Sequence, residues 1–404
     1  MKVLQVIDTL GMGGAETWLM DMLRLWSRSG DVQMDFLITS GNRGIFDDEA
    51  RELGAQIHYA RFGRPHLLSF VPEYRRILAR GYRAIHDHQA YVSGWHFLLG
   101  AGLLPSVRVA HVHNPEYQIL NNYGVTPSRR LAAWLGKDFV GRFATHIAGT
   151  SREAIEAYGF NAPAFRHIPT GVLHCGIKTG RFIGDEKAAK AAVCDEFGWP
   201  RDARIIVNVG RIDQSADFGH PQSHKNTGFA VAVAIEYART DLRARMIFAG
   251  EPSPAVAVLE ARIAEAGLSG RIVFVGIRHD VSRLILGSDV MLFPSHGEGL
   301  GMVAVEAQAA GLPVIASTNV PEECVVIPGM VTFLEVTGDP VPWAAEAARV
   351  AERGRRDNAS CNAAVRDSPF SIEYSARALR ELYFQPNPPE SFVRGGTAPH
   401  GRKD

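Results

Sequence analysis

The chain has few cysteines, and their placement argues against two ways of stabilising a protein. Only four occur in 404 residues, at Cys175, Cys194, Cys324 and Cys361, without the paired spacing of a disulfide framework or a metal knuckle. We therefore expect reduced thiols in a reducing compartment. The composition, 46% hydrophobic and 21% charged residues, is that of a globular protein and excludes a disordered or fibrous chain.

Net charge and long apolar segments are also lacking. Lys and Arg number 43, as do Asp and Glu, so bulk charge favours no nucleic acid or other polyanion as a partner. The longest uncharged run, residues 90–107, contains His96, Pro105 and three glycines, which suits a buried helix and turn better than a membrane span. The opening MKVLQVIDTLG lacks the features of a signal peptide and predicts a buried strand. We expect a cytoplasmic protein.

Basic residues are nevertheless concentrated in one region. Residues 51–170 contain 14 Lys and Arg against 7 Asp and Glu. Within this region Arg129, Arg130, Lys137 and Arg142 alternate with apolar residues, a pattern typical of an amphipathic helix that contacts anionic lipid. The alternative is an ordinary solvated helix face.

Short apolar runs alternate with amphipathic segments along the chain. The expected strands of the first half are residues 2–7, 34–39, 84–88, 108–113 and 145–150, with a first helix at 15–30. The expected strands of the second half are residues 204–210, 244–250, 271–276, 290–295 and 313–317. This alternation predicts two α/β units, each with a doubly wound parallel sheet.

The strand pattern restarts after a segment rich in turn-forming residues, 167–182, which we interpret as the junction. We therefore predict an N-terminal Rossmann-like domain over residues 1–175 and a C-terminal one over residues 176–370. Residues 371–384 would form a C-terminal helix that can return to the first domain. The Pro- and Gly-rich residues 385–404 would form a flexible tail.

The first candidate motif is GMGGAE, residues 11–16, directly after the opening strand. Glycines at a strand-to-helix turn let the backbone approach a phosphate, and the helix start supplies unpaired N–H groups. A dinucleotide fingerprint would need glycine where Glu16 stands, so that match fails. The alternative is a tight turn that binds nothing.

The second motif is VNVGRIDQSADFGHPQSHKN, residues 207–226. Arg211 follows a glycine that ends a strand, and Lys225 precedes a new helix, so both cations are expected at the carboxyl edge of the sheet, where such folds bind ligands. They suit a diphosphate that gains charge as it leaves. His220 and His224 stand four residues apart, but without an acid or cysteine at suitable spacing we predict no metal site.

The third motif is PSHGEGLGMVAVEAQAAGLPVIAS, which places Glu298 and Glu306 in an otherwise uncharged run. Glu298 is expected on a loop before a helix and Glu306 about one and a half turns inside that helix. The amides of residues 299–302 could hold a phosphate with help from the helix dipole. Glu306 could then accept both hydroxyls of a ribose, and Glu298 could bind sugar hydroxyls. Alternatively, Glu298 caps the helix and Glu306 pairs with a cation.

This third motif resembles the signature of the retaining glycosyltransferases of family 4, which have the GT-B fold. That pattern has Pro-Ser, two variable residues, Glu-Gly, an apolar residue and Gly, with a second Glu eight residues after the first. The glycine loop and the segments RVAHVHN (108–114), VGR (209–211), FAGE (248–251) and VGIRHDV (275–281) agree in order. The resemblance covers about residues 1–380 and is closest to transferases for exopolysaccharide and lipopolysaccharide.

The resemblance implies an α/β protein with two Rossmann-like domains facing across a cleft, the first on the acceptor side and the second binding a nucleotide sugar. Glu306 would bind the ribose and Glu298 the donor sugar, while Arg211 and Lys225 would neutralise the diphosphate. The amides for the diphosphate would come from Gly299, Leu300, Gly301 and Met302.

Further positions are implied in the same way. Gly13 and Gly14 would let the loop of the first domain close on the phosphates. Gly276 and Ile277 would flank the nucleobase. His113 matches a family histidine near the sugar, although its residue type alone also fits a buried histidine of the core.

Two departures from the family pattern concern the second half. Fourteen positions separate Arg211 from Lys225, so residues 212–224 look like an inserted loop, which puts the role of Lys225 in doubt. Lys178 stands where the family tends to have Asp, which we interpret as local variation.

These patterns predict a transferase that moves a sugar from a UDP- or GDP-linked donor to an acceptor hydroxyl with retention of configuration. The resemblance implies no cofactor beyond the donor, and the cations make a metal ion unnecessary. The acceptor would be a glycan or a lipid-linked sugar, with peripheral contact to the inner membrane face. Two other functions stay open: a nucleotide-sugar 2-epimerase of the same fold, and a non-catalytic nucleotide-sugar binding protein.

Overall fold

The computed structural model describes residues 1–117, 126–220, 222–384 and 392–393. The chain divides into two compact units. The first contains Met1–Ile177 together with the C-terminal residues from Ile372, and the second contains Lys178–Ser371. The flexible tail predicted for residues 385–404 lies outside the described residues, apart from the short strand β14 (Phe392–Val393).

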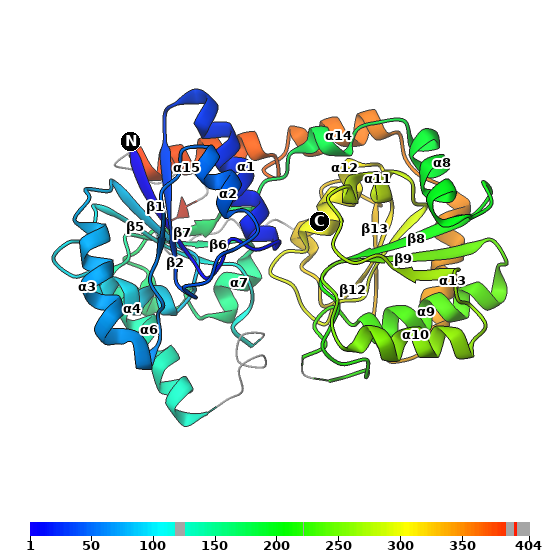
Figure 1. Cartoon of the computed structure of the whole chain (residues 1–404), viewed down its shortest axis with the longest axis horizontal. Helices are drawn as coiled ribbons and strands as arrows, with labels where there is room; N and C mark the ends of the chain where they lie inside the picture. The colour runs from blue at the N-terminus through cyan, green and yellow to red at the C-terminus, as the bar shows by residue number, and fades with distance from the viewer. Residues whose placement is uncertain (118–125, 221, 385–391, 394–404) are drawn as a thin grey trace, which may run out of the picture. The chain divides into compact units, whose positions relative to one another are not determined.

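The first unit is built on a twisted parallel sheet (Figure 1). Its strands are β1 (Lys2–Ile7), β2 (Gln33–Ile38), β3 (Ile57–Tyr59), β4 (Ala84–Asp87), β5 (Val107–Val112), β6 (His146–Gly149) and β7 (Thr170–Val172). The order is β3-β2-β1-β4-β5-β6-β7, and β14 adds an antiparallel edge beside β7. The order therefore reverses between β1 and β4.

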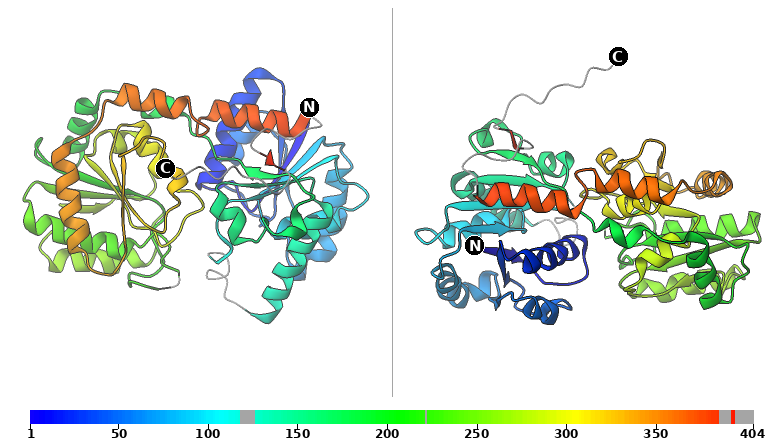
Figure 2. Two further views of the ribbon diagram at one scale, coloured as in Figure 1. Left: turned by 180° about the vertical axis from the view of Figure 1, so that it is seen from behind. Right: turned by 90° about the horizontal axis from the view of Figure 1, so that it is seen from above.

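Helices cover both faces of this sheet. They are α1 (Gly14–Ser29), α2 (Asp47–Glu52), α3 (Leu67–Leu78), α4 (Val92–Leu99), α6 (Pro127–Phe143), α7 (Arg152–Ala157) and α15 (Ile372–Phe384). On one face, Leu4 and Val6 pack with Tyr74, Phe97 and Val140 from α3, α4 and α6. On the other, α1 contacts α15, which comes from the end of the chain and is orange to red in Figure 2.

The second unit has its own six-stranded parallel sheet, in the order β10-β9-β8-β11-β12-β13. Its strands are β8 (Arg204–Val209), β9 (Ala244–Ala249), β10 (Ile272–Phe274), β11 (Val290–Phe293), β12 (Val314–Ser317) and β13 (Val331–Leu334). Its helices are α8 (Glu186–Phe197), α9 (Thr227–Thr240), α10 (Ala255–Glu265), α11 (Val281–Leu286), α12 (Met302–Ala309), α13 (Val341–Arg353) and α14 (Asn358–Arg366). Phe229 and Trp343 meet edge to face in the core, with 5.5 Å between their ring centroids.

The predicted fold class, two doubly wound parallel α/β sheets, is confirmed. Hydrophobic runs indicated the buried central strands, whereas the short edge strands β3, β7 and β13 were not predicted, because only part of each is buried. Residues 90–107 contain helix α4 followed by a turn, as expected. None of the helices in the described part of the chain combines the length and the apolar character that crossing a bilayer requires.

Candidate functional site

Both sheets have a point where the strand order reverses, between β1 and β4 and between β8 and β11. The loops that leave the carboxyl ends of such strands turn to opposite faces, which leaves room for a ligand at that edge. In the second unit the loop after β8 contains Arg211 and Lys225, and the loop after β11 contains Glu298. The strand order therefore gathers these three residues at one edge.

Lys225 and Glu298 form an ion pair at this edge. The Lys225 Nζ lies 2.7 Å from Oε1 of Glu298 and 5.6 Å from the centroid of the Phe293 ring. Glu298 is 9% exposed, so its carboxylate needs a partner, and Lys225 supplies it. The alternative role of Glu298 as a helix cap is wrong, because Gly301 occupies the N-cap position of α12 and no side chain caps that end.

Asp213 explains why the inserted loop leaves Lys225 in place. One oxygen of its carboxylate accepts a hydrogen bond from the backbone N–H of Lys225 at 3.0 Å, and the other accepts one from the backbone N–H of Thr227 at 2.9 Å. These bonds tie the start of the loop to the start of α9. Asn226 between them has a positive φ of 57°, which this bracing holds in place. The insertion of residues 212–224 therefore leaves Lys225 beside Glu298. The role of Lys225 in binding a diphosphate stays a prediction.

Three glycines meet at the ends of the neighbouring strands. The backbone N–H of Gly250 donates to the carbonyl of Gly276 at 2.9 Å, and a Cβ on Gly250 would lie 1.9 Å from the carbonyl oxygen of Gly210. This close approach leaves the next residues at the surface, where Arg211 is exposed and Ile277 is 45% exposed. Within the described part of the chain, Arg211 has no hydrogen bond or ion pair.

Helix α12 begins at the same edge. Gly301 precedes it with φ 88°, and a Cβ there would lie 2.9 Å from the ring of Phe293, so only glycine fits. The first amides of a helix have no intrahelical acceptor, which makes this end a suitable anion site. Met302 and Glu306, one turn apart, are both half-buried, so one side of the first turns remains accessible.

In the first unit, Gly13 and Gly14 stand at the start of α1, next to the end of β1. Gly13 is the N-cap residue with an extended φ of −105°, and Gly14 opens the helix. Among the described residues, a Cβ on Gly14 would meet nothing within 4 Å, and one on Gly13 would meet the carboxylate of Glu16. Neither backbone conformation nor packing within this unit requires glycine here, which leaves close approach of another molecule as a reason.

His113 follows β5 and is only half-buried. Its Nε2 lies 2.8 Å from Nδ1 of His88, and its Nδ1 lies 3.7 Å from the sulfur of Cys175. Burial lowers the pKa of His113 to about 3, so the ring is neutral at ordinary pH. A ligand hydroxyl could reach Nδ1 only by replacing the thiol, which is a weak donor.

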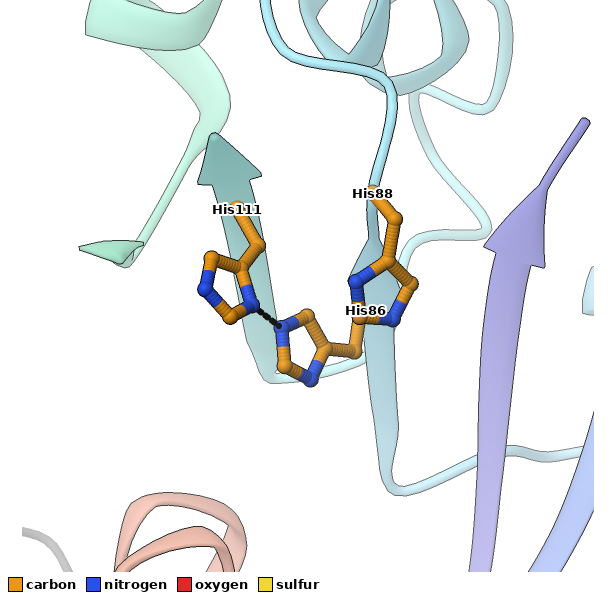
Figure 3. Close-up of side chains that lie close together, drawn as sticks. All are labelled: His86, His88 and His111. Carbon is orange, nitrogen blue, oxygen red and sulfur yellow. Dashed lines mark hydrogen bonds between the residues drawn. The ribbon is translucent and has the colours of Figure 1, made fainter. Parts of the chain in front are cut away.

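Sequence reasoning missed the residues that surround His113. His86, His88, His111 and Gln5 form a buried polar cluster on the face of the sheet that α1 and α15 cover. The signal was present as two His-x-His patterns on adjacent strands, because alternate residues of a strand share a face. In the described part of the chain, His86, His88 and His111 form the group close enough to hold a metal ion, and neither His220 nor His224 belongs to it (Figure 3).

The predicted site residues thus form two groups, one in each unit. Gly13 and Gly14 lie at the reversal point of the first sheet, and His113 lies near it, after the neighbouring strand β5. The second group lies at or near the reversal point of the second sheet and contains Arg211, Lys225, Gly276, Ile277, Glu298, Gly299, Leu300, Gly301, Met302 and Glu306. That both groups serve one site stays a prediction.

Known families match both halves of the chain. Residues 12–174 match the family described as Glycosyltransferase Family 4, and residues 204–353 match the family described as Glycosyl transferases group 1. A curated relative, the putative glycosyltransferase EpsF of Bacillus subtilis, is 27% identical over 95% of this chain and 96% of its own length. The lipopolysaccharide core biosynthesis mannosyltransferase LpsB of Rhizobium meliloti is 28% identical over 72% of this chain and 78% of its own length.

Solved structures agree at the level of the fold. HepE of Anabaena, crystallised with UDP, aligns with a TM-score of 0.73 and 16% identity over 94% of this chain and 99% of its own. The lipopolysaccharide outer core galactosyltransferase WaaB aligns with a TM-score of 0.64 and 13% identity over 95% and 99%. The strand order, the motif from Pro294 to Ser317 and these matches lead to one conclusion: the chain belongs to the family 4 glycosyltransferases and has the GT-B fold.

Proposed function

We propose that this protein transfers a sugar from a nucleotide-diphosphate sugar to an acceptor hydroxyl with retention of configuration, in the synthesis of a cell-surface polysaccharide or glycolipid. The observation that carries the proposal is the Lys225–Glu298 pair at the reversal point of the second sheet, beside the start of α12. It places a cation, a carboxylate and free helix amides together, which is what a sugar diphosphate needs. The name of LpsB, a lipopolysaccharide core biosynthesis mannosyltransferase, supports the biological setting, and that of EpsF supports the class of reaction.

The donor would lie along this edge in a fixed order. Glu298 would accept hydrogen bonds from sugar hydroxyls, and the amides of residues 299–302 with Arg211 and Lys225 would bind the diphosphate. Glu306 would accept the ribose hydroxyls, and Gly276 and Ile277 would flank the base. HepE was solved with UDP and with UDP-glucose, which favours a uridine donor over a guanosine one.

In the proposed reaction the protein mainly positions the two substrates and stabilises the charge of the leaving diphosphate. The bond from the anomeric carbon to the phosphate oxygen breaks, and the acceptor oxygen bonds to that carbon from the same face. The acceptor proton passes to the leaving phosphate oxygen. Arg211, Lys225 and the dipole of α12 would stabilise the negative charge that grows on the diphosphate. These fixed positive groups make a divalent metal unnecessary for the step.

A panel of UDP- and GDP-linked sugars tests the proposal. The correct donor should raise the melting temperature with concentration and turn over with release of the nucleoside diphosphate. Anomeric analysis of the product by NMR should show retention, and turnover should persist in EDTA. An interconverted nucleotide sugar formed without acceptor would identify a 2-epimerase instead. If a donor binds but no donor is turned over with any acceptor, the protein is a non-catalytic nucleotide-sugar binding protein.

Matched variants test the role of the Lys225–Glu298 pair. Lys225→Met removes the cation and leaves Glu298 buried without its partner, and Glu298→Gln removes the carboxylate while keeping its shape. Both should lower kcat/KM about 100-fold, because each removes a charge-assisted contact worth about 3 kcal/mol. Lys190→Met is the control, since Lys190 is a similarly exposed lysine that pairs with Asp289 away from this edge. Equal turnover by wild type and Lys225→Met would refute this arrangement.

Contact with a membrane surface would bring a lipid-linked acceptor to the first unit. Helix α6 presents Leu131 and Trp134, which are 56% and 62% exposed, next to the exposed Arg130. Two further cations of this helix, Lys137 and Arg142, pair with acids of the chain, so the attraction is moderate. Trp134→Glu should reduce co-sedimentation with anionic vesicles, and Leu242→Glu, at an 83% exposed site of the second unit, should not. If the protein binds neutral vesicles as well as anionic ones, the basic residues do not contribute electrostatic attraction to the membrane.

A further inference from the structure

A chain of hydrogen bonds connects His113 with the C-terminal helix. His113 Nε2 lies 2.8 Å from His88 Nδ1, and His88 Nε2 lies 2.9 Å from Oε1 of Gln5. The amide nitrogen of Gln5 donates to the hydroxyl of Tyr383, on α15, at 3.2 Å. Gln5 and Tyr383 are fully buried, so the two bonds that Gln5 makes are shielded from water, and the bond between His113 and His88 is partly buried.

The chain continues beyond Tyr383. The Tyr383 hydroxyl lies 2.6 Å from Nδ1 of His86, and Nε2 of His86 lies 3.1 Å from Nδ1 of His111, the bond drawn in Figure 3. Trp18 of α1 closes one side of the cluster, with its ring edge-on to those of His86, His88 and His111. Burial lowers the pKa of all three histidines well below its usual value, so the rings are neutral.

The ring geometry favours hydrogen bonds over a metal ion. Potential ligand atoms of His86, His88 and His111 lie within 4.8 Å of one another. However, the ring centroids of His86 and His111 are 5.1 Å apart, whereas the facing ring nitrogens are 3.1 Å apart. The difference between these distances is close to two ring radii, and the ring planes differ by 16°. The two nitrogens therefore face each other head-on. The rings of His86 and His88 are stacked, with 4.2 Å between their centroids. Their nitrogen lone pairs are therefore roughly parallel and do not point toward one tetrahedrally coordinated metal ion.

The direction of donation follows from the amide of Gln5. Its oxygen accepts from His88, so His88 has its proton on Nε2 and a lone pair on Nδ1. His113 must then donate from Nε2, which leaves the lone pair on its own Nδ1. The amide nitrogen of Gln5 donates to Tyr383, which accordingly donates its hydroxyl proton to His86.

The opposite orientation of Gln5 is disfavoured at the far end of the chain. It would reverse every bond and leave Nε2 of His111 without a proton; this atom is buried and has no hydrogen-bond partner among the described residues by the usual distance and angle limits. The backbone of Leu173 acts to raise the pKa of His111, as an acceptor near a ring N–H does. This contact favours a proton on Nε2 of His111, which is the pattern that the first orientation of Gln5 produces.

We propose that Tyr383 is a positioning residue of the transferase: through Gln5 and His88 it fixes His113 in the tautomer with the proton on Nε2, so that Nδ1 accepts a hydrogen bond from a hydroxyl of the donor sugar. This inference rests on the proposed function and on the family resemblance, which implies that His113 lies near the sugar. The hydroxyl replaces the Cys175 thiol, which at 3.7 Å is a weak donor to the same atom. The C-terminal helix thereby becomes part of the site without touching the substrate.

The test compares Tyr383→Phe with Tyr74→Phe in the full chain. Tyr74 is a matched control, because it is fully buried in the same unit and its hydroxyl has no hydrogen-bond partner among the described residues. Nitrogen NMR of histidine-labelled protein, with His113 assigned by a His113→Gln variant, reports which ring nitrogen is protonated. Wild type and control should show the Nε2–H tautomer of His113, and Tyr383→Phe should show a mixture of tautomers. Turnover of Tyr383→Phe should fall about 10-fold in kcat, with little change in the KM for the donor.

An unchanged His113 tautomer in Tyr383→Phe would overturn the inference. So would a stoichiometric transition metal in the purified protein that His86→Gln abolishes. A changed tautomer with unchanged kcat would show that His113 does not bind the sugar. That result would overturn the inferred positioning role of Tyr383, while the proposed transfer reaction and the hydrogen-bond chain would stand. If Tyr383→Phe does not fold, Gln5→Met, similar in shape but unable to bond to His88, gives the same readout.

Discussion

Single residues set the electrostatics of the second unit. The ion pair of Lys225 and Glu298 is nearly neutral as a unit, so the exposed Arg211 provides the unbalanced positive charge at this edge. Asp213 contributes by holding backbone N–H groups in place. The position of the half-buried Lys225 is fixed by this carboxylate, which lies earlier in the same loop.

Asp213→Ala should both destabilise the second unit and disturb Lys225. The substitution removes the acceptor for two backbone N–H groups at the start of α9, a loss of about 1–2 kcal/mol. We expect a lower denaturant midpoint and a several-fold higher KM for the donor. Asp217→Ala is the control in the same loop, because the Asp217 side chain is 76% exposed and its ion pair with Arg262 adds little stability. Equal effects of the two changes would exclude the bracing role.

Glu306→Gln should weaken nucleotide binding. A carboxylate that accepts two ribose hydroxyls is a stronger acceptor than an amide, so we expect about a 10-fold higher Kd. Titration calorimetry with UDP and GDP measures this change. Glu260→Gln, on the exposed face of α10, should leave the Kd unchanged. If Glu306→Gln binds both nucleotides as wild type does, the ribose role is refuted.

At the scale of elements, the loops at the carboxyl ends of strands are held by contacts behind them. The segment between β10 and α11 contains Gly276 and Ile277, and an ion-pair network anchors the residues that follow. Arg278 bonds Glu196 of α8 at 2.7 Å and Asp280 at 2.8 Å. The positions of Gly276 and Ile277 therefore depend on charged side chains that lie outside the proposed site.

This network predicts a pH dependence of stability. Hydrogen bonds from Arg278 lower the pKa of Asp280 and of Glu196 below the values of the unfolded chain, about 4. The stabilisation is therefore complete above about pH 5 and is lost as the pH falls through the lower values of the folded state. Because these side chains are partly exposed, we expect only about 1 kcal/mol.

Thermal melts of wild type and Arg278→Ala measure this effect. The variant should melt about 2 °C lower at pH 7, and the gap should shrink toward pH 3. Arg201→Ala, which breaks an exposed pair with Asp195, should show almost no gap at either pH. A gap for Arg278→Ala that is constant with pH would mean that packing, and not charge, accounts for it.

At the scale of the whole molecule, the two units differ in how the chain builds them. The second is one continuous segment, Lys178–Ser371, with its own core around Phe229 and Trp343. The first needs two segments, because α15 from the end of the chain packs on α1 and places Tyr383 in the polar cluster.

Separate expression of segments tests this difference. Residues 178–371 alone should unfold cooperatively and bind the nucleotide product of the donor. Residues 1–177 alone should fold poorly, because the buried Gln5 and His86 lose their Tyr383 partner and the apolar side chains under α15 become exposed. Adding residues 372–393 through a flexible linker should restore a cooperative transition in circular dichroism. A stable 1–177 fragment would contradict the structural role of α15.

The features that could be predicted from the sequence are those that depend on short stretches of the chain. The buried central strands, the helix after GMGGAE and the two doubly wound sheets follow from periodicity and turn residues within short windows. Gly301 could be recognised from its motif because its positive φ is a property of one residue and its neighbours. The family resemblance likewise rested on a continuous stretch.

Contacts between residues far apart in the sequence could not be predicted in this way. Lys225 pairs with Glu298, 73 positions away, because β8 and β11 are neighbours in the sheet. Tyr383 meets His86 across 297 positions because α15 returns to the first unit. Such contacts depend on strand order and helix packing, which no short window of sequence specifies, and they determine which carboxylate is paired and which histidine nitrogen holds a proton.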